Sequence, residues 1–435
     1  MIDPLYIISA AFLIVMVILI MVWNNPLAVL GTHISSRVIL DGFSSITYEK
    51  VILNLSIMQI YSIGIIIFLT LYIALKKERD QKLFFLFIPV MIIIISYVFS
   101  GFINNDWLPV IEKITMWIYL VLLSGFIVYI LQYYHLNSLI FVLWISLLPA
   151  VVIQIVAILS NDYSIAAGGH KTYSGGYAHQ FMLSYLLLGF TFSSIYISVA
   201  HKNIIANIFF ILCAFWGMIG IYLCGYRSSL LALLVFLSFA FAYYISRSNV
   251  PRKFLALYFI PVFMASIFYY LGADFSGRMY DIWLFIQSPS SYIDFSGDPE
   301  VDLIFSGRIY IINTLMAAYL SSPMEAIIFG MGIESSDKII GTYAHNEYVS
   351  ALVETGIFGI FSFSAFIIFY LYTLLKNKKI MPINECIVLS FGIGLLVMSL
   401  STMPFRCMRA MMLIGIVFGI MYYRNSTLKI NKSVV

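Results

Sequence analysis

Charged residues are too scarce in this sequence to cover a water-soluble fold. Only 10% of the 435 residues are Asp, Glu, Lys or Arg, whereas 62% are hydrophobic. The mean hydropathy of +0.99 excludes an ordinary soluble domain, which needs a polar surface around its core. Apolar runs recur along the whole chain, and each can cross about 30 Å of hydrocarbon as a helix. We therefore predict an integral membrane protein of the all-α class.

Cysteine pairs and metal-binding motifs are also missing. The chain has four scattered cysteines and no CxxC pair, namely Cys213, Cys224, Cys386 and Cys407. This spacing argues against zinc and redox chemistry. Cys224 and Cys407 fall on the same side of the membrane in the predicted topology, so the sequence leaves open whether they pair. Because HxxH, HxxxH and DxD motifs are absent, a metal site built from His170, His179 and His345 is disfavoured, and we expect no metal or cofactor.

Hydropathy predicts twelve membrane spans with both termini in the cytoplasm. The spans cover residues 5–23, 51–75, 83–99, 114–132, 139–160, 180–200, 204–223, 229–245, 254–271, 347–375, 386–403 and 408–423. The first run has no basic residue before it and no clear cleavage site after it, so we interpret it as a retained span. Every tight cluster of Lys and Arg then falls on one side, which the positive-inside rule assigns to the cytoplasm.

The longest predicted loop lies on the outer side, at residues 272–346. A structureless loop of this length is unusual, so we expect it to contain helices of its own on the outer surface. The chain is thus predicted to be one membrane domain, 1–435, with this loop inserted between the ninth and tenth spans. Shorter outer segments are expected at 24–50, 100–113, 161–179 and 224–229.

Two arginine motifs on the outer side could hold an anion. In CGYRSS, residues 224–229, Arg227 stands at a tight turn between two spans, where the two serines could cap the next helix. The alternative is an arginine that snorkels to lipid phosphates, but the short turn keeps this guanidinium near the bundle, where it can bind phosphate oxygens bidentately. The second motif is Ser306-Gly307-Arg308, for which a solvated surface arginine is the alternative.

The third outer element is GTYAHNEYVSALVETGIFG, residues 341–359. Asn346 is predicted to cap a membrane helix whose first free N–H groups and positive dipole end attract an anion. His345 lies at the rim of this end, where its unperturbed pKa of about 6.5 suits proton transfer, although a structural histidine is the alternative. Glu347 and Glu354 share one face of the helix. Together the three elements suit a phosphate-bearing lipid headgroup.

In order and spacing these motifs resemble the O-antigen polymerase and O-antigen ligase superfamily. The resemblance rests on Tyr226-Arg227-Ser228-Ser229, Ser306-Gly307-Arg308, the Gly330–Gly332 turn, Ala344-His345-Asn346, and Glu354-Thr355-Gly356 with Gly359. The twelve-span layout with a large late outer loop is also similar. The resemblance implies a GT-C-like fold and an inverting glycosyltransferase of the bacterial inner membrane, with its active site facing the periplasm.

The resemblance also implies roles for single residues. Arg227 and Arg308 would hold the diphosphate of a polyprenyl-diphosphate-linked oligosaccharide in place of a metal, and His345 would orient or deprotonate the acceptor hydroxyl. The tryptophan expected after the Ser-Gly-Arg motif is absent behind Arg308, whereas the near repeat DFSGRMY carries Arg278 and is followed by Trp283. Which copy functions is left open, with Arg308 favoured by its spacing. Further substrate-binding candidates are Arg278, Tyr226, Asn346, Glu354, His179 and Arg406.

We interpret the sequence as an O-antigen polymerase that joins lipid-linked repeat units during lipopolysaccharide biosynthesis. An O-antigen ligase, which transfers the glycan to lipid A core, is the close alternative. Span number alone would also fit a lipid-linked-sugar flippase or secondary transporter, but ionisable residues can nearly all be assigned to loops and span ends. The expected partners are the lipid-linked donor and acceptor, membrane lipid and a chain-length regulator protein. Nucleic acid is not expected, because no dense basic face occurs.

Overall fold

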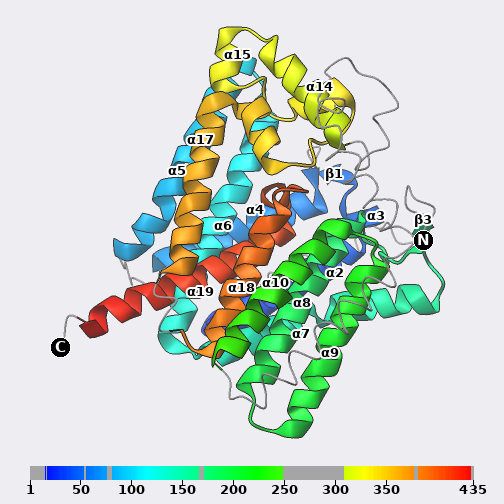
Figure 1. The fold of residues 1–435 in the computed structure, drawn as a ribbon, viewed down its shortest axis with the longest axis vertical. Coiled ribbons are helices and arrows are strands. Elements are labelled where there is room, and N and C mark those ends of the chain that lie inside the picture. The colour runs from blue at the N-terminus through cyan, green and yellow to red at the C-terminus, as the bar shows by residue number, and fades with distance from the viewer. Residues whose placement is uncertain are drawn as a thin grey trace.

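The computed structural model describes residues 15, 17–52, 55–75, 81–165, 171–247, 308–376 and 381–432, which form a helical bundle with two short strand pairs (Figure 1). The helices are α2 (Pro26–Gly42), α3 (Ser44–Thr47), α4 (Ile57–Leu75), α5 (Gln81–Asn104), α6 (Trp107–Tyr133), α7 (Leu136–Leu159), α8 (Gln180–Ala200), α9 (Ile204–Leu223), α10 (Arg227–Arg247), α14 (Arg308–Leu320), α15 (Met324–Phe329), α16 (Ser335–Ile340), α17 (Glu347–Leu375), α18 (Ile383–Met398), the 3-10 helix η3 (Pro404–Arg406) and α19 (Met408–Lys432). The antiparallel strand pairs are β1 (Lys50–Ile52) with β2 (Leu55–Ser56), and β3 (Ser164–Ile165) with β4 (Lys171–Thr172).

Eight helices in the described ranges are long and apolar enough to cross a membrane. They are α4, α5 from Phe87 to Asn104, α6, α7, α8, α9, α10 from Arg227 to Tyr244, and α17. The predicted spans 180–200, 204–223 and 347–375 coincide with α8, α9 and α17. These helices confirm the predicted all-α polytopic class. The predicted span 254–271 lies outside the described residues, as does most of 5–23.

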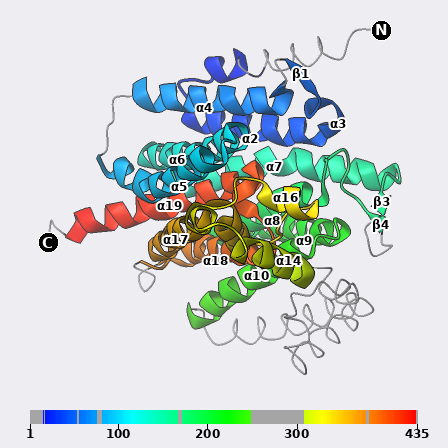
Figure 2. The same cartoon turned by 90° about the horizontal axis from the view of Figure 1, so that it is seen from above.

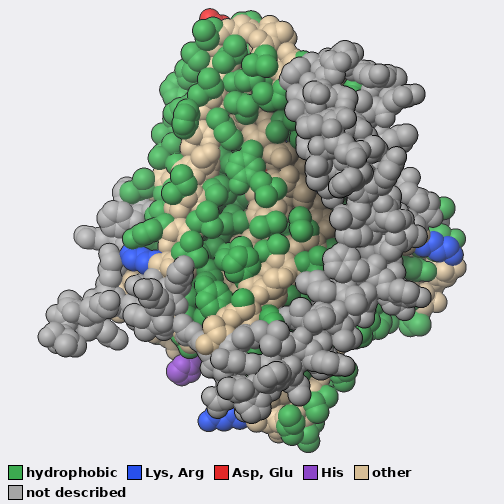
Figure 3. Space-filling model, viewed as in Figure 1, with side chains coloured by type: hydrophobic (Ala, Val, Ile, Leu, Met, Phe, Trp, Pro, Cys, Tyr) green, Lys and Arg blue, Asp and Glu red, His purple; other side chains and the backbone are tan. Residues whose placement is uncertain are grey.

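Apolar side chains cover much of the outward surface of these helices. Figure 3 shows hydrophobic side chains over most of the described part of one face, with few charges among them. Helix α9 is typical, because Ile205, Leu212 and Phe215 are all exposed. Since each helix satisfies its own backbone hydrogen bonds, such a surface suits contact with lipid tails.

Helix α2 crosses the bundle where the sequence predicted an outer loop. It begins at Pro26, after Asn25, whose side chain accepts the N–H of Ala28 at 3.2 Å. Just before this cap, Trp23 packs on Tyr72 near the end of α4, with ring centroids 4.7 Å apart. The beginning of α2 therefore lies at the end of the bundle that leads to the basic connection after α4.

The second half of α2 lies beside the beginning of α4 (Figure 2). There, Arg37 Nη1 donates to Ser62 Oγ at 2.8 Å. Helix α2 is thus antiparallel to α4, and the prediction that 24–50 is an outer segment is wrong. Hydropathy misses this helix because its sequence contains the polar residues His33, Arg37 and Asp41, which are typical of a loop. In the structure all three are buried on α2. The cytoplasmic amino terminus stays a prediction, because residues 1–14 lie outside the described part.

The described part of the long outer loop is helical, as predicted. Helices α14, α15 and α16 lie at one end of the bundle, beside the ends of α5 and α17 (Figure 1). Polar contacts attach this segment to the α5–α6 connection. Lys338 Nζ lies 2.6 Å from Asp106, and Asn104 Nδ2 donates to the carbonyl of Gly330 at 3.1 Å. The segment is therefore fixed on the bundle end that carries the predicted site residues.

Candidate functional site

Helix α17, which begins two residues after His345, is broken at Gly356. This glycine has φ 69° and ψ −166°, a conformation that other residues adopt only with strain. A Cβ atom here would collide with the carbonyl of Ile328, and one at Gly330 would collide with the carbonyl of Glu354. The outer segment therefore packs backbone against backbone on the break. This contact sets the direction of the first turns of α17.

The predicted cap at Asn346 is confirmed. Its Oδ1 accepts the N–H groups of Tyr348 at 2.9 Å and Val349 at 3.1 Å. The preceding N–H, from Glu347, donates to the carbonyl of Ser399 at 3.1 Å. The prediction that free N–H groups at this helix end bind an anion is wrong, because the protein itself occupies them. The N–H groups of residues 347–349 are therefore not available to an anion.

His345 adopts an unusual backbone conformation directly before this cap. Its φ of 49° lies in the left-handed region, which costs a residue other than glycine about 1–3 kcal/mol. The side chain is half-buried. Burial lowers the pKa of the His345 imidazole, and the nearby positive charges of Arg308 and His179 lower it further. The ring is therefore held in its neutral form over a wider pH range than a free histidine.

Arg308, the first residue of α14, connects His345 electrostatically to the α9–α10 turn. Burial lowers the pKa of the Arg308 guanidinium, the Tyr226 hydroxyl opposes this shift, and the charge of Arg227 adds to it. His179, the residue before α8, has its ring 6.5 Å from that of Tyr226. The cationic cluster is our name for five residues from four separate segments, namely His179, Tyr226, Arg227, Arg308 and His345. Arg308 thus lies within electrostatic range of His345, Arg227 and Tyr226, and His179 lies beside Tyr226.

The two serines after Arg227 do not act as the caps expected from the sequence. Ser229 Oγ shares a hydrogen bond of 2.8 Å with Ser184 Oγ in α8. Ser228 Oγ donates to the carbonyl of Ser401 at 3.3 Å. The two hydroxyls therefore attach the beginning of α10 to α8 and to the turn that follows α18.

Glu354 and Arg406 were predicted to bind substrate, but in this structure they bind each other. Arg406 Nη1 and Nη2 donate to the two carboxylate oxygens of Glu354, each at 2.6 Å. Their side chains are only 1% and 8% exposed. Ser350 Oγ donates a further bond to Glu354 at 3.1 Å. This geometry favours a structural function for the pair, and its contact with substrate stays a prediction.

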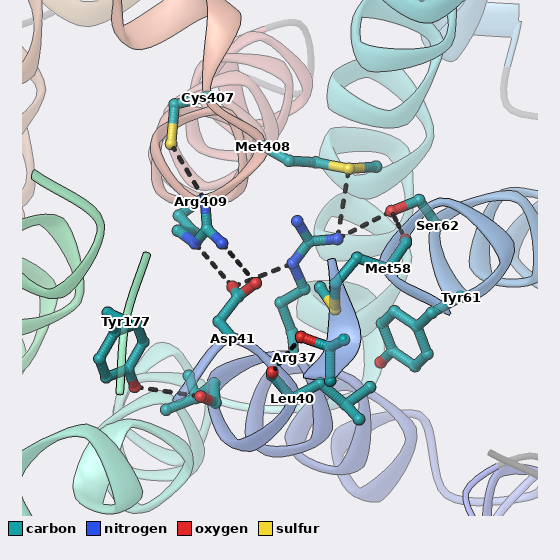
Figure 4. A network of polar contacts seen from close by, with 12 residues as sticks. Arg37, Leu40, Asp41, Met58, Tyr61, Ser62, Tyr177, Cys407, Met408 and Arg409 are labelled. Carbon is teal, nitrogen blue, oxygen red and sulfur yellow. Dashed lines mark hydrogen bonds and ion pairs between the residues drawn. The ribbon is translucent and has the colours of Figure 1, made fainter. Parts of the chain in front are cut away.

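A second buried ionic network was missed by the sequence analysis. Asp41 lies between Arg37 and Arg409, which both donate to its carboxylate (Figure 4). Arg37 Nε donates at 3.2 Å and Arg409 Nε at 2.6 Å. The side chain of Asp41 is fully buried. The only signal in the sequence is charge within apolar segments, and no local pattern could pair residues 368 positions apart.

The remaining predictions concern Arg278, His170, the cysteines and metal binding. Arg278 and His170 lie outside the described residues, so the choice between the two Ser-Gly-Arg copies stays a prediction. None of the four cysteines forms a disulfide, and Cys224 is buried and accepts a hydrogen bond from Gln154, so the Cys224–Cys407 disulfide left open above is absent. Within the described ranges, no group of three His, Cys, Asp or Glu side chains could hold a metal ion.

Comparison with known proteins supports the motif-based resemblance. Residues 209–364 match the family model described as O-antigen ligase. This range includes Arg227, Arg308 and His345, whereas His179 lies before it. No curated protein matches the chain. The match agrees with the resemblance to the O-antigen polymerase and ligase superfamily, and the eight candidate spans agree with a multi-pass membrane protein.

Proposed function

We propose, on the premise of this match to the O-antigen ligase family, that the protein is an O-antigen polymerase of the bacterial inner membrane. It would transfer a glycan from a polyprenyl diphosphate onto a sugar of a second lipid-linked repeat unit on the periplasmic face. The observation that supports the proposal is that Arg308 lies within electrostatic range of both His345 and Arg227, although the three residues are distant in the sequence.

The cluster has the groups that this transfer requires. Arg227 and Arg308 supply two guanidinium groups, which suit the diphosphate of the donor and the charge that develops on it as it leaves. The acceptor hydroxyl oxygen attacks the anomeric carbon, the bond from that carbon to the diphosphate oxygen breaks, and the hydroxyl proton passes to His345. A depressed pKa keeps the imidazole of His345 neutral and able to accept this proton.

The strain at His345 supports this role. A left-handed histidine persists only where the surrounding structure holds it, and such residues gather at functional sites. The cap at Asn346 supplies this constraint directly after His345.

An O-antigen ligase is the second candidate, because the matched family carries that description. The two functions share the donor and the chemistry and differ in the acceptor, which is a lipid-linked repeat unit for a polymerase and lipid A core for a ligase. The chain-length regulator and the cytoplasmic termini stay predictions.

Reconstitution of the purified protein in vesicles with lipid-linked repeat units alone tests the proposal. Elongated glycans are expected from the wild type, and Arg227→Ala and His345→Ala should each abolish them at unchanged protein abundance. His201→Ala is the matched control, since this exposed histidine ends α8 at the end opposite to His179. A reaction only after addition of lipid A core would identify a ligase instead. Movement of the lipid-linked unit across the vesicle without elongation would identify a flippase.

A further inference from the structure

The connection between α18 and α19 contacts two parts of the cationic cluster. One is the segment that follows His345, and the other is the α9–α10 turn that carries Arg227. Residues 399–402, which we name the bridge, follow α18 directly. Their N–H groups donate back to the carbonyls of Leu396, Val397 and Met398 at 2.9–3.2 Å. The bridge is therefore an ordered turn, and its carbonyls remain available to other segments.

Two bridge residues hold the beginning of α17. The carbonyl of Ser399 accepts the N–H of Glu347 at 3.1 Å, and the carbonyl of Leu400 accepts Asn346 Nδ2 at 3.0 Å. Asn346 and Glu347 are the two residues directly after His345. These bonds therefore fix the position of the histidine backbone.

The next two bridge residues hold the α9–α10 turn. The carbonyl of Ser401 accepts Ser228 Oγ at 3.3 Å, and Thr402 Oγ1 shares a hydrogen bond of 2.5 Å with the Tyr226 hydroxyl. Tyr226 and Ser228 flank Arg227 on both sides. Four consecutive residues thus bind the neighbours of the histidine and the neighbours of the arginine.

The far end of this connection is anchored as well. Phe405 stacks on Trp117 of α6 with ring centroids 5.5 Å apart and planes at 6°. Arg406 forms the buried pair with Glu354 of α17. The bridge therefore lies between two ordered elements, so it can keep a constant distance between the groups that it holds.

We infer that the bridge sets the spacing between His345 and Arg227, and that Thr402 is a positioning residue for the proposed glycosyl transfer. The inference rests on the proposed function. Thr402 acts through Tyr226 and does not itself touch substrate. Because reacting groups must lie in a narrow range of geometry, a displacement of about 1 Å can lower the rate about 100-fold. Loss of one bridge bond should therefore reduce turnover more than it reduces donor binding.

Kinetic comparison of three Thr402 and Asn346 variants tests this role in the reconstituted protein. Thr402→Val removes the bond to Tyr226 at constant volume and should lower kcat at least about tenfold with little change in KM for the donor. Thr402→Ser keeps the hydroxyl and should restore kcat. Asn346→Ser keeps a capping oxygen but loses the amide donor to Leu400, so it should also lower kcat, which gives a second measurement if Thr402→Val fails to fold.

Thr373→Val is the matched control. Thr373 is also a buried threonine, but its hydroxyl bonds only to the carbonyl of Phe369 in its own helix, so kcat should stay unchanged. Unchanged kcat in Thr402→Val and Asn346→Ser, with Arg227→Ala and His345→Ala inactive, would overturn the inference and leave the proposed function intact. Full elongation by the Arg227→Ala and His345→Ala variants would overturn the proposed function itself.

Discussion

The buried pair of Glu354 and Arg406 allows a prediction of stability. Removal of one partner leaves a charge in a site where the side chains are 1% and 8% exposed, and the two bonds of 2.6 Å are lost. Breaking such a buried pair costs about 3–5 kcal/mol, because the remaining charge loses its bidentate partner. Arg406→Leu also removes the ion pair of Arg406 Nε with Glu347 at 3.9 Å. In Arg406→Leu, the carboxylate keeps only Ser350 at 3.1 Å and Ser336 at 3.5 Å as hydrogen-bond donors. We therefore expect a loss of unfolding free energy in this range.

The double variant Glu354→Leu/Arg406→Leu should recover part of this loss. It removes both charges of the pair, and apolar replacement of a buried pair is often neutral or stabilising by about 1–4 kcal/mol, but Glu347 still loses its ion pair with Arg406. The free energy of unfolding can be measured by titration of mixed micelles with sodium dodecyl sulfate, followed by tryptophan fluorescence. The four proteins then form a double-mutant cycle, which isolates the interaction of the pair.

The pair of Lys338 and Asp106 is the control. Lys338 Nζ also lies 2.6 Å from Asp106 Oδ2, but the two side chains are 64% and 29% exposed. Lys338→Leu should therefore lower the free energy of unfolding by at most about 1 kcal/mol. Equal losses in Lys338→Leu and Arg406→Leu would refute the argument from burial. If the double variant loses as much unfolding free energy as the two single variants together, each residue has separate partners of equal importance.

Two further predictions follow from the site. Because burial and the charge of Arg308 lower the pKa of His345, and a base works in its neutral form, the acid limb of the pH profile of kcat/KM should lie below the ordinary value of about 6.5. Arg308→Gln removes one positive charge, so the acid limb of its residual activity should move to higher pH, and an unmoved limb would exclude His345 as the titrating base. Gly356→Ala should lower the midpoint of thermal unfolding more than Gly341→Ala does. Both glycines have positive φ, 69° and 67°, but only at Gly356 would a Cβ meet backbone, so equal shifts would contradict the proposed tight contact.

The sequence alone was sufficient for features that depend on local chemistry. The hydropathy of α8, α9 and α17 predicted these helices to the residue, because a membrane span is defined by the side chains of one segment. The cap at Asn346 was equally predictable, since a capping side chain bonds to the backbone two and three residues ahead.

The tertiary structure alone decided which distant residues are partners. Asp41 and Arg409 are 368 residues apart, and their pairing depends on how α2 packs against α19. The same holds for Glu354 and Arg406, which look available for substrate in the sequence but neutralise each other in the fold. It holds also for Thr402, whose function depends on the helices that meet at the bridge. Local sequence determines what a segment can form, whereas a buried polar group takes its partner from whichever helix packs beside it.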